Sequence, residues 1–361
     1  MKKYIFILIF PLLVMTNLSF GLEVKLVKRF LLSQEKTILM SISCFAVTED
    51  EMLILPDVKD GNIKFYDNTG NLIKIWGRRG PGPDEFQSPM YCDYQKPYYI
   101  HLDLGKMRIS IYKRAERAKF VRINEILCVG CFSDVRLLNK NVLVAGNKED
   151  SNGNKFALYV KDFEDKETHY LLPSYVKYGF KSAYGFDRKY GEISPIGVTA
   201  HFHVHGDYVY YVWEGRLRIV RINLKTKKMG TFGQETKNYV RPKVTKGILE
   251  ARRIRKGIIE RKEKEKMSWV TGVFADEDFI GLIYTNFDKV SSLWKAFLQL
   301  YSPEGELMSE VALPDAVTYV MGGPSNFYKK DDQHLYILSR RLNEEGYMDE
   351  YEIFKYKIIV N

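Results

Sequence analysis

Short runs of alternating apolar and polar residues recur along most of the chain, and turn-forming residues separate them. In one such unit, apolar runs at 51–56, 62–66 and 71–76 are joined by turns, the second of which is Asp67-Asn-Thr-Gly70. Alternation with a period of two is typical of strands that bury one face. The pattern therefore predicts antiparallel hairpins that follow one another directly along the chain.

The hairpin unit is repeated, and each copy is preceded by a further short strand-like run, such as 41–47 or 197–205. We expect six units of four strands, at about residues 41–77, 89–123, 131–172, 197–233, 270–313 and 318–360. One four-stranded sheet cannot bury both of its faces alone, so the units should stack around a ring. The sequence predicts an all-β fold, a six-bladed β-propeller of four-stranded antiparallel blades. A β-sandwich with an extra sheet is the alternative, which we disfavour because the units repeat hairpin by hairpin.

The last predicted unit is one outer strand short. The segment 22–32 alternates like a strand but belongs to none of the six units. We expect it to pair as the outer strand of the last blade and so to close the ring, which makes residues 22–361 a single domain.

The first 21 residues have the pattern of a signal peptide. Lys2 and Lys3 precede an apolar run at 4–15, and small residues follow at Ser19 and Gly21. The run is short for a membrane span. We expect cleavage near residue 21 and export to the periplasm or the cell exterior, with a retained membrane anchor as the alternative.

The net charge of +10 is concentrated in one segment. Residues 243–267 hold ten basic and four acidic side chains, so most of the rest of the chain is close to neutral. A local basic segment in an exported protein does not favour a nucleic-acid partner. Apolar residues at helical spacing predict a helical insertion over 243–266, namely Ile248, Ala251, Ile254 and Ile258. We favour a helix packed on the propeller over one that contacts an anionic membrane surface or an acidic partner.

A glycine- and proline-rich crossover, Trp76 to Pro89, follows the first unit, and a fainter copy lies at 232–242. We expect Gly77, Gly80 and Gly82 to adopt positive φ and Phe86 to pack between blades. The alternative is functional: Arg78 and Arg79 would lie at one face of the ring and bind an acidic ligand. A nucleotide-binding loop would need a strand–loop–helix context, which the pattern lacks.

With the preceding Asp-x-x-Gly turn, this crossover resembles the linker of NHL-type and related TolB-like six-bladed bacterial propellers. Those linkers typically read Gly-x-x-Gly-x-Gly-x-x-Glu-Phe-x-x-Pro, as residues 77–89 do. The match is partial at 232–242 and weak elsewhere. The resemblance implies an exported or sensor-linked binding module.

Three histidines alternate along one expected strand, at His201, His203 and His205. Alternate residues share a face, and imidazole is a good ligand for transition metals, so two of them, His201 and His203, could hold a divalent metal. We favour hydrogen-bonded or solvated histidines beside the central channel, and the predicted function requires no cofactor.

The four cysteines include one closely spaced pair, Cys128-Val-Gly-Cys131. A turn at the two central residues would let the pair form a disulfide, which export permits. Zinc would need a second pair, and Cys44 and Cys92 occupy comparable early positions in the first two units. We favour a disulfide or buried thiols over a metal site.

The spacing of the residues indicates no Ser, His and Asp triad, no catalytic pair of carboxylates and no phosphate-binding loop. We therefore predict an exported binding or scaffold module that recognises a protein or a small ligand at a propeller face or in the central channel, without catalysis. The alternative is a metal-dependent enzyme of the lactonase or lyase kind, with its site in the channel.

Overall fold

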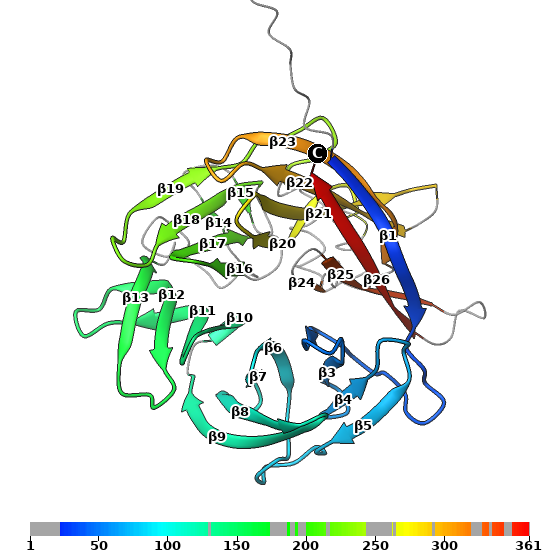
Figure 1. The fold of residues 1–361 in the computed structure, drawn as a ribbon. Coiled ribbons are helices and arrows are strands. Elements are labelled where there is room, and N and C mark those ends of the chain that lie inside the picture. The colour runs from blue at the N-terminus through cyan, green and yellow to red at the C-terminus, as the bar shows by residue number, and fades with distance from the viewer. Residues whose placement is uncertain are drawn as a thin grey trace, which may run out of the picture.

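Most of the described residues lie in strands, which form six four-stranded antiparallel sheets arranged in a ring (Figure 1). The computed structural model describes residues 22–128, 131–173, 186–187, 192–193, 200–213, 217–242, 262, 265–290, 293–318, 327–331, 334–342 and 349–360. The fold is the predicted six-bladed β-propeller. A small hairpin, β14 (Phe186–Asp187) with β15 (Glu192–Ile193), occurs in the sequence between the third and fourth blades.

Each of the first five blades is a run of four consecutive strands, the first nearest the centre of the ring and the last at its outer edge (Figure 1). Blade 1 contains β2 (Ala46–Val47), β3 (Leu53–Asp57), β4 (Asn62–Tyr66) and β5 (Leu72–Trp76). Blade 2 contains β6 (Pro89–Gln95), β7 (Tyr98–Asp103), β8 (Arg108–Glu116) and β9 (Lys119–Leu127). Blade 3 contains β10 (Cys131–Leu138), β11 (Asn141–Glu149), β12 (Lys155–Asp162) and β13 (Thr168–Pro173). Blade 4 contains β16 (Ala200–His205), β17 (Tyr208–Trp213), β18 (Ile219–Asn223) and β19 (Met229–Phe232). Blade 5 contains β20 (Trp269–Ala275), β21 (Ile280–Asp288), β22 (Leu293–Tyr301) and β23 (Leu307–Thr318).

The sixth blade combines both ends of the described chain. It contains β24 (Phe327–Asp331), β25 (His334–Leu342) and β26 (Asp349–Val360), with β1 (Leu22–Leu31) as the outer strand. β1 pairs antiparallel with β26 from Leu22 opposite Val360 to Leu31 opposite Glu352. The two strands lie side by side in Figure 1, so the first described residues complete the ring.

The core is divided among the contacts between neighbouring blades. Six clusters of buried apolar side chains, one at each contact, go around the ring. The cluster between blades 6 and 1 includes Leu55 and Tyr351, and the one between blades 1 and 2 includes Phe65 and Tyr99. Each blade thus buries both faces against its neighbours, which is why one blade cannot be stable alone.

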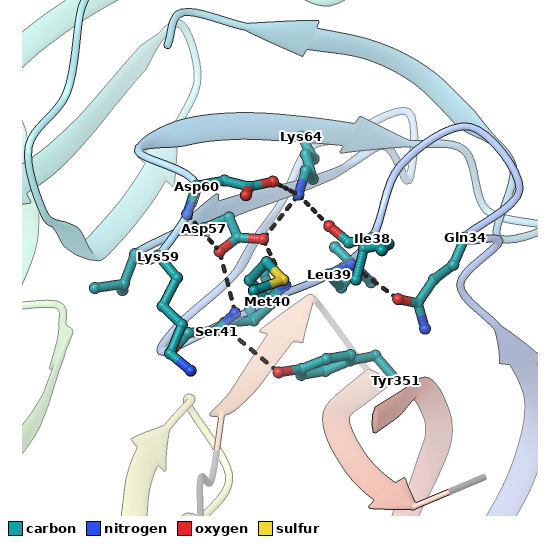
Figure 2. Close-up of polar contacts among 12 residues, drawn as sticks. Gln34, Ile38, Leu39, Met40, Ser41, Asp57, Lys59, Asp60, Lys64 and Tyr351 are labelled. Atoms are coloured by element: carbon teal, nitrogen blue, oxygen red, sulfur yellow. Dashed lines mark hydrogen bonds and ion pairs between the residues drawn. The ribbon is translucent and has the colours of Figure 1, made fainter. Parts of the chain in front are cut away.

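A buried polar cluster holds the connection between β1 and blade 1 (Figure 2). The Lys64 side chain is fully buried, and its Nζ lies 2.7 Å from Oδ2 of Asp57 and 2.6 Å from Oδ2 of Asp60. The same ammonium donates to the carbonyl of Ile38 at 2.6 Å. A buried ammonium needs such partners to offset its lost hydration.

Asp57 also accepts hydrogen bonds from the backbone N–H groups of residues 40–41, at 2.8 and 3.1 Å. Asp103 does the same in blade 2, where it accepts from the N–H groups of residues 87–88, both at 2.8 Å. Both aspartates end the second strand of a blade and fix the segment that enters it. This repetition indicates a structural role for the cluster in Figure 2.

Residues 1–21, the predicted signal peptide, lie outside the described residues. So does most of the predicted helical insertion, of which only 262, 265 and 266 are described. No helix longer than a single residue occurs in the described ranges, and none there is long and apolar enough to cross a membrane.

Candidate functional site

The glycine-rich crossover between β5 and β6 packs one aromatic side chain into the contact of blades 1 and 2. Phe86 is buried there and meets Trp76 edge-on, with 5.6 Å between ring centroids. Gly77 has φ +74°, and a Cβ on it would lie 2.4 Å from the Phe86 ring. Glycine is therefore required at 77 by both conformation and space.

Gly80 and Gly82 do not have the expected positive φ. The left-handed residue of this turn is Asp84, with φ 55°. The two glycines instead make room for the carboxylate of Glu85, which accepts a hydrogen bond from Gly82 N at 2.8 Å, and a Cβ on Gly80 would lie 2.1 Å from that carboxylate. Space, and not backbone conformation, explains glycine at these two positions.

The two arginines of the crossover are engaged within the protein. Arg78 Nε lies 2.8 Å from Glu85 Oε1, and Arg79 Nη2 donates to the carbonyls of Val58, at 2.9 Å, and Lys59. These contacts support the loop. Ligand binding by Arg78 and Arg79 stays a prediction.

A hollow of about 430 Å³ opens beside this crossover, against blade 2. The hollow is lined by the crossover, the β7–β8 turn and the two outer strands β8 and β9. The lining residues are Pro81, Gly82, Pro83, Gln87, Gly105, Lys106, Arg108, Arg122 and Glu125. Three cationic side chains face one carboxylate, so the lining is cationic. Its volume is within the range of small-molecule sites.

Glu125 lies between the two arginines of this hollow. Its Oε2 is 2.8 Å from Arg108 Nη1 and its Oε1 is 3.1 Å from Arg122 Nη1. Burial acts to raise the pKa of Glu125, but the bond from Arg108 and the charges of both arginines outweigh it and lower that pKa. Glu125 is therefore an anion that organises the two guanidinium groups.

Both guanidinium groups remain accessible, since the Arg108 side chain is 50% exposed and that of Arg122 is 35% exposed. Among the described residues, each donates to a protein acceptor only through Nη1. Arginine has five N–H donors in a planar fork that matches carboxylate and phosphate groups. The remaining donors of Arg108 and Arg122 can bind an anion.

A shift in register brings Arg122 and Glu125 together. Residues three apart on a regular strand point to opposite faces. Here Ile111 pairs with Asn124 but Tyr112 pairs with Arg122, so residue 123 is an extra residue in β9. The bulge re-aims one side chain and places both on the same hollow.

Lys106 fixes the crossover against blade 2. Its Nζ donates to the carbonyls of Gly82, at 2.9 Å, and Glu85, at 2.7 Å. The loop that forms one wall of the hollow is therefore held in place by the β7–β8 turn that forms another.

A second hollow, of about 400 Å³, lies at the opposite end of β8 and β9. It contains as many acidic as basic side chains, among them the bidentate pair of Arg114 and Asp50, with both N–O distances 2.8 Å. Its charges satisfy one another, so the cationic hollow is the stronger candidate for a ligand site.

The predicted histidines lie on β16, the innermost strand of blade 4. Burial, with the charge of the nearby Arg136, lowers the pKa of His201 to about 3, so this imidazole is neutral near pH 7. His203 pairs with Tyr210 of β17 in the register. Within the part of the chain that the structure describes, no three His, Cys, Asp or Glu side chains are grouped to hold a metal. Metal binding by His201 and His203 stays a prediction.

Arg136, which no pattern in the sequence marks, connects the innermost strands of three blades. From β10 it donates to the carbonyl of Cys92 on β6 at 3.2 Å and to that of Phe202 on β16 at 3.3 Å. Its Nη2 is 3.0 Å from Oδ2 of the buried Asp134. These contacts join the innermost strands of three blades, so they have a structural explanation.

Cys128 is disulfide-bonded. The side chain of Cys131, its predicted partner, lies outside the described residues, and the pairing of these two stays a prediction. Cys44 and Cys92 are buried and free.

Comparison with solved structures shows the fold. The chain is similar to a member of the DUF4221 family from Bacteroides vulgatus, with a TM-score of 0.63 and 12% identity over 95% of this chain and 100% of that one. It is also similar to a Bacteroides fragilis protein named for its proposed export, with a TM-score of 0.58 and 12% identity over 94% and 95% of the two chains. No protein-family model matches the chain. No curated protein matches it either. At this identity the similarity shows the β-propeller fold alone.

Proposed function

We propose that this propeller is a binding module that recognises a small anionic ligand, one that bears carboxylate or phosphate groups, in the hollow beside the crossover. The observation that carries the proposal is the pair Arg108 and Arg122, held on either side of Glu125 with further donors available. Two guanidinium groups on a rigid sheet can bind such groups with little loss of conformational freedom. Lys106 donates to two carbonyls of the crossover and so stabilises the hollow. We therefore expect Arg108 and Arg122, and not Lys106, to bind the ligand.

Isothermal titration tests this with two probes, citrate for carboxylates and inorganic phosphate for phosphates. We expect saturable binding of at least one probe at one site, weakened by about tenfold or more in Arg108→Ala and in Arg122→Ala. The difference between the probes identifies the chemical group that is preferred. Because the interaction is electrostatic, binding should also weaken as ionic strength rises.

The matched control is Arg117→Ala, because Arg117 lines the charge-balanced hollow at the other end of the blade. It should bind both probes like the wild type. No saturable binding of either probe, or the same loss in all three variants, would overturn the proposal.

We also propose that the protein is exported and resembles NHL- and TolB-like propellers more closely than other propellers. The charged and apolar order of residues 1–21 supports export, as does the name of the similar Bacteroides fragilis protein. Detection of a mature chain that begins near residue 22, outside the cytoplasm, would test export.

The metal-dependent enzyme of the lactonase or lyase kind remains an alternative. The similarity to virginiamycin B lyase from Staphylococcus aureus has a TM-score of only 0.42, at 11% identity over 94% of this chain and all of that one, and carries no argument. A stoichiometric metal in the purified protein that is lost in His201→Ala and His203→Ala would favour this alternative.

A further inference from the structure

We infer that Cys44 and Cys92 are the site of a second disulfide, one that joins the innermost parts of blades 1 and 2. Cys44 lies two residues before β2, and Cys92 lies within β6. Forty-eight positions separate them in the sequence, but their Sγ atoms are 3.0 Å apart.

The surroundings hold the two thiols close together. Next to them, Ser43 Oγ donates to the carbonyl of Met90 and so joins the same two segments. Both thiols are buried in the apolar cluster between blades 1 and 2, which also contains Ala46 and Tyr99. A disulfide needs Sγ atoms about 2.05 Å apart, so closing this pair requires a movement of roughly 1 Å.

A second observation indicates that the fold is compatible with oxidising conditions. Cys128, near the contact of blades 2 and 3, is already disulfide-bonded. A chain that keeps one disulfide in its folded state does not depend on a reducing environment. The same conditions can oxidise the 44–92 pair.

The reaction is thiol–disulfide exchange with a low-molecular-weight disulfide such as oxidised glutathione. One cysteine thiolate attacks the oxidant, breaks its S–S bond and expels one thiolate. The second cysteine attacks the mixed disulfide and expels the other, so the oxidant gains two electrons and takes up the two protons that the cysteines lose. Burial, followed by the hydrogen bond to Cys92, raises the pKa of the Cys44 thiol well above its usual value. Exchange should therefore occur before blades 1 and 2 close on each other.

Mass spectrometry tests the inference on the chain from residue 22. Protein purified without reductant, and protein refolded with a mixture of reduced and oxidised glutathione, are denatured with iodoacetamide and digested. We expect a linked peptide pair that contains Cys44 and Cys92, with a mass two hydrogens below the sum of the free peptides. The inference would be overturned if Cys44 and Cys92 were both alkylated after refolding in oxidant. It would also be overturned if either one were linked to Cys128 or Cys131.

Thermal unfolding gives an independent measurement. A crosslink over 48 positions reduces the conformational entropy of the unfolded chain and so stabilises the folded state. Reductant should therefore lower the unfolding midpoint of the wild type by roughly 2–10 °C more than that of Cys44→Ala/Cys92→Ala. The double variant retains the Cys128 disulfide and so controls for it. Equal effects of reductant on both proteins would contradict a 44–92 disulfide.

Discussion

Arg29 Nη2 lies 2.9 Å from Oε1 and 3.1 Å from Oε2 of Glu352, which joins two residues at opposite ends of the chain. Arg29 belongs to β1 and Glu352 to β26, the two outer strands of the sixth blade. The ring is therefore closed by pairing of the chain ends, and its stability depends on this contact.

Arg29→Ala should lower the free energy of unfolding by about 1–3 kcal/mol, because Glu352 is almost completely buried and loses a charged partner. Lys25→Ala is the control on the same strand. Lys25 pairs with Glu23 at 3.0 Å with both side chains about half exposed, so its loss should cost less than about 0.5 kcal/mol. Urea unfolding of the two variants measures the difference. Equal free energies of unfolding would show that the Arg29–Glu352 pair contributes little to closing the ring.

Lys64→Met should cost about 3–5 kcal/mol, because it leaves Asp57 and Asp60 without their shared ammonium in a buried cluster. The neighbouring Lys59 is exposed, so Lys59→Met should cost little. Urea denaturation compares both with the wild type. A Lys64→Met protein as stable as Lys59→Met would show that the cluster in Figure 2 contributes little.

His101→Phe should stabilise the protein. His101 is fully buried, and its ring lies 4.9 Å from that of Phe86. Among the described residues, neither of its ring nitrogens has a hydrogen-bond partner. At pH 7 we expect a gain of about 1 kcal/mol from the removal of these unpaired groups.

The same variant should change the response to acid. Burial lowers the pKa of His101 to about 4, whereas the unfolded chain takes up this proton near pH 6.5. The wild type therefore loses stability as the pH falls from about 6.5 towards 4, and the advantage of His101→Phe should grow over that window. Urea unfolding at pH 7 and 5 measures this, with the exposed His169→Phe as control. A constant difference between the two pH values would show that His101 is not held neutral.

Glu125→Gln should tighten citrate binding by about two- to tenfold, equivalent to roughly 0.4–1.4 kcal/mol. The carboxylate competes with the ligand for Arg108 and Arg122, and the amide does not carry its charge. Glu116→Gln, at the opposite end of β8, is the matched control. Titration that shows weaker citrate binding in Glu125→Gln would indicate that Glu125 positions the arginines more than it competes with the ligand.

The repeat could be predicted from the sequence because hairpin alternation and turn residues are local signals. The crossover aromatic Phe86 was recognisable for the same reason, and the sixth unit was visibly one strand short, a place that β1 fills. The reason for Gly80 and Gly82 was missed because the side chain of Glu85, and not the backbone, demands them.

The cationic hollow could not be predicted from the sequence. Arg108 and Glu125 belong to different strands, and their contact depends on the pairing register of β8 with β9. The extra residue at 123 reverses the expected facing of Arg122, and no local pattern marks such a bulge. The Arg136 contacts likewise depend on how the innermost strands of three blades meet.

Modification of arginines by phenylglyoxal, read by mass spectrometry with and without citrate, tests the binding site most directly. We predict that citrate slows the modification of Arg108 and Arg122 and leaves that of Arg117 unchanged. Equal modification rates with and without citrate at Arg108 and Arg122, or the same protection at Arg117, would contradict a ligand site in this hollow.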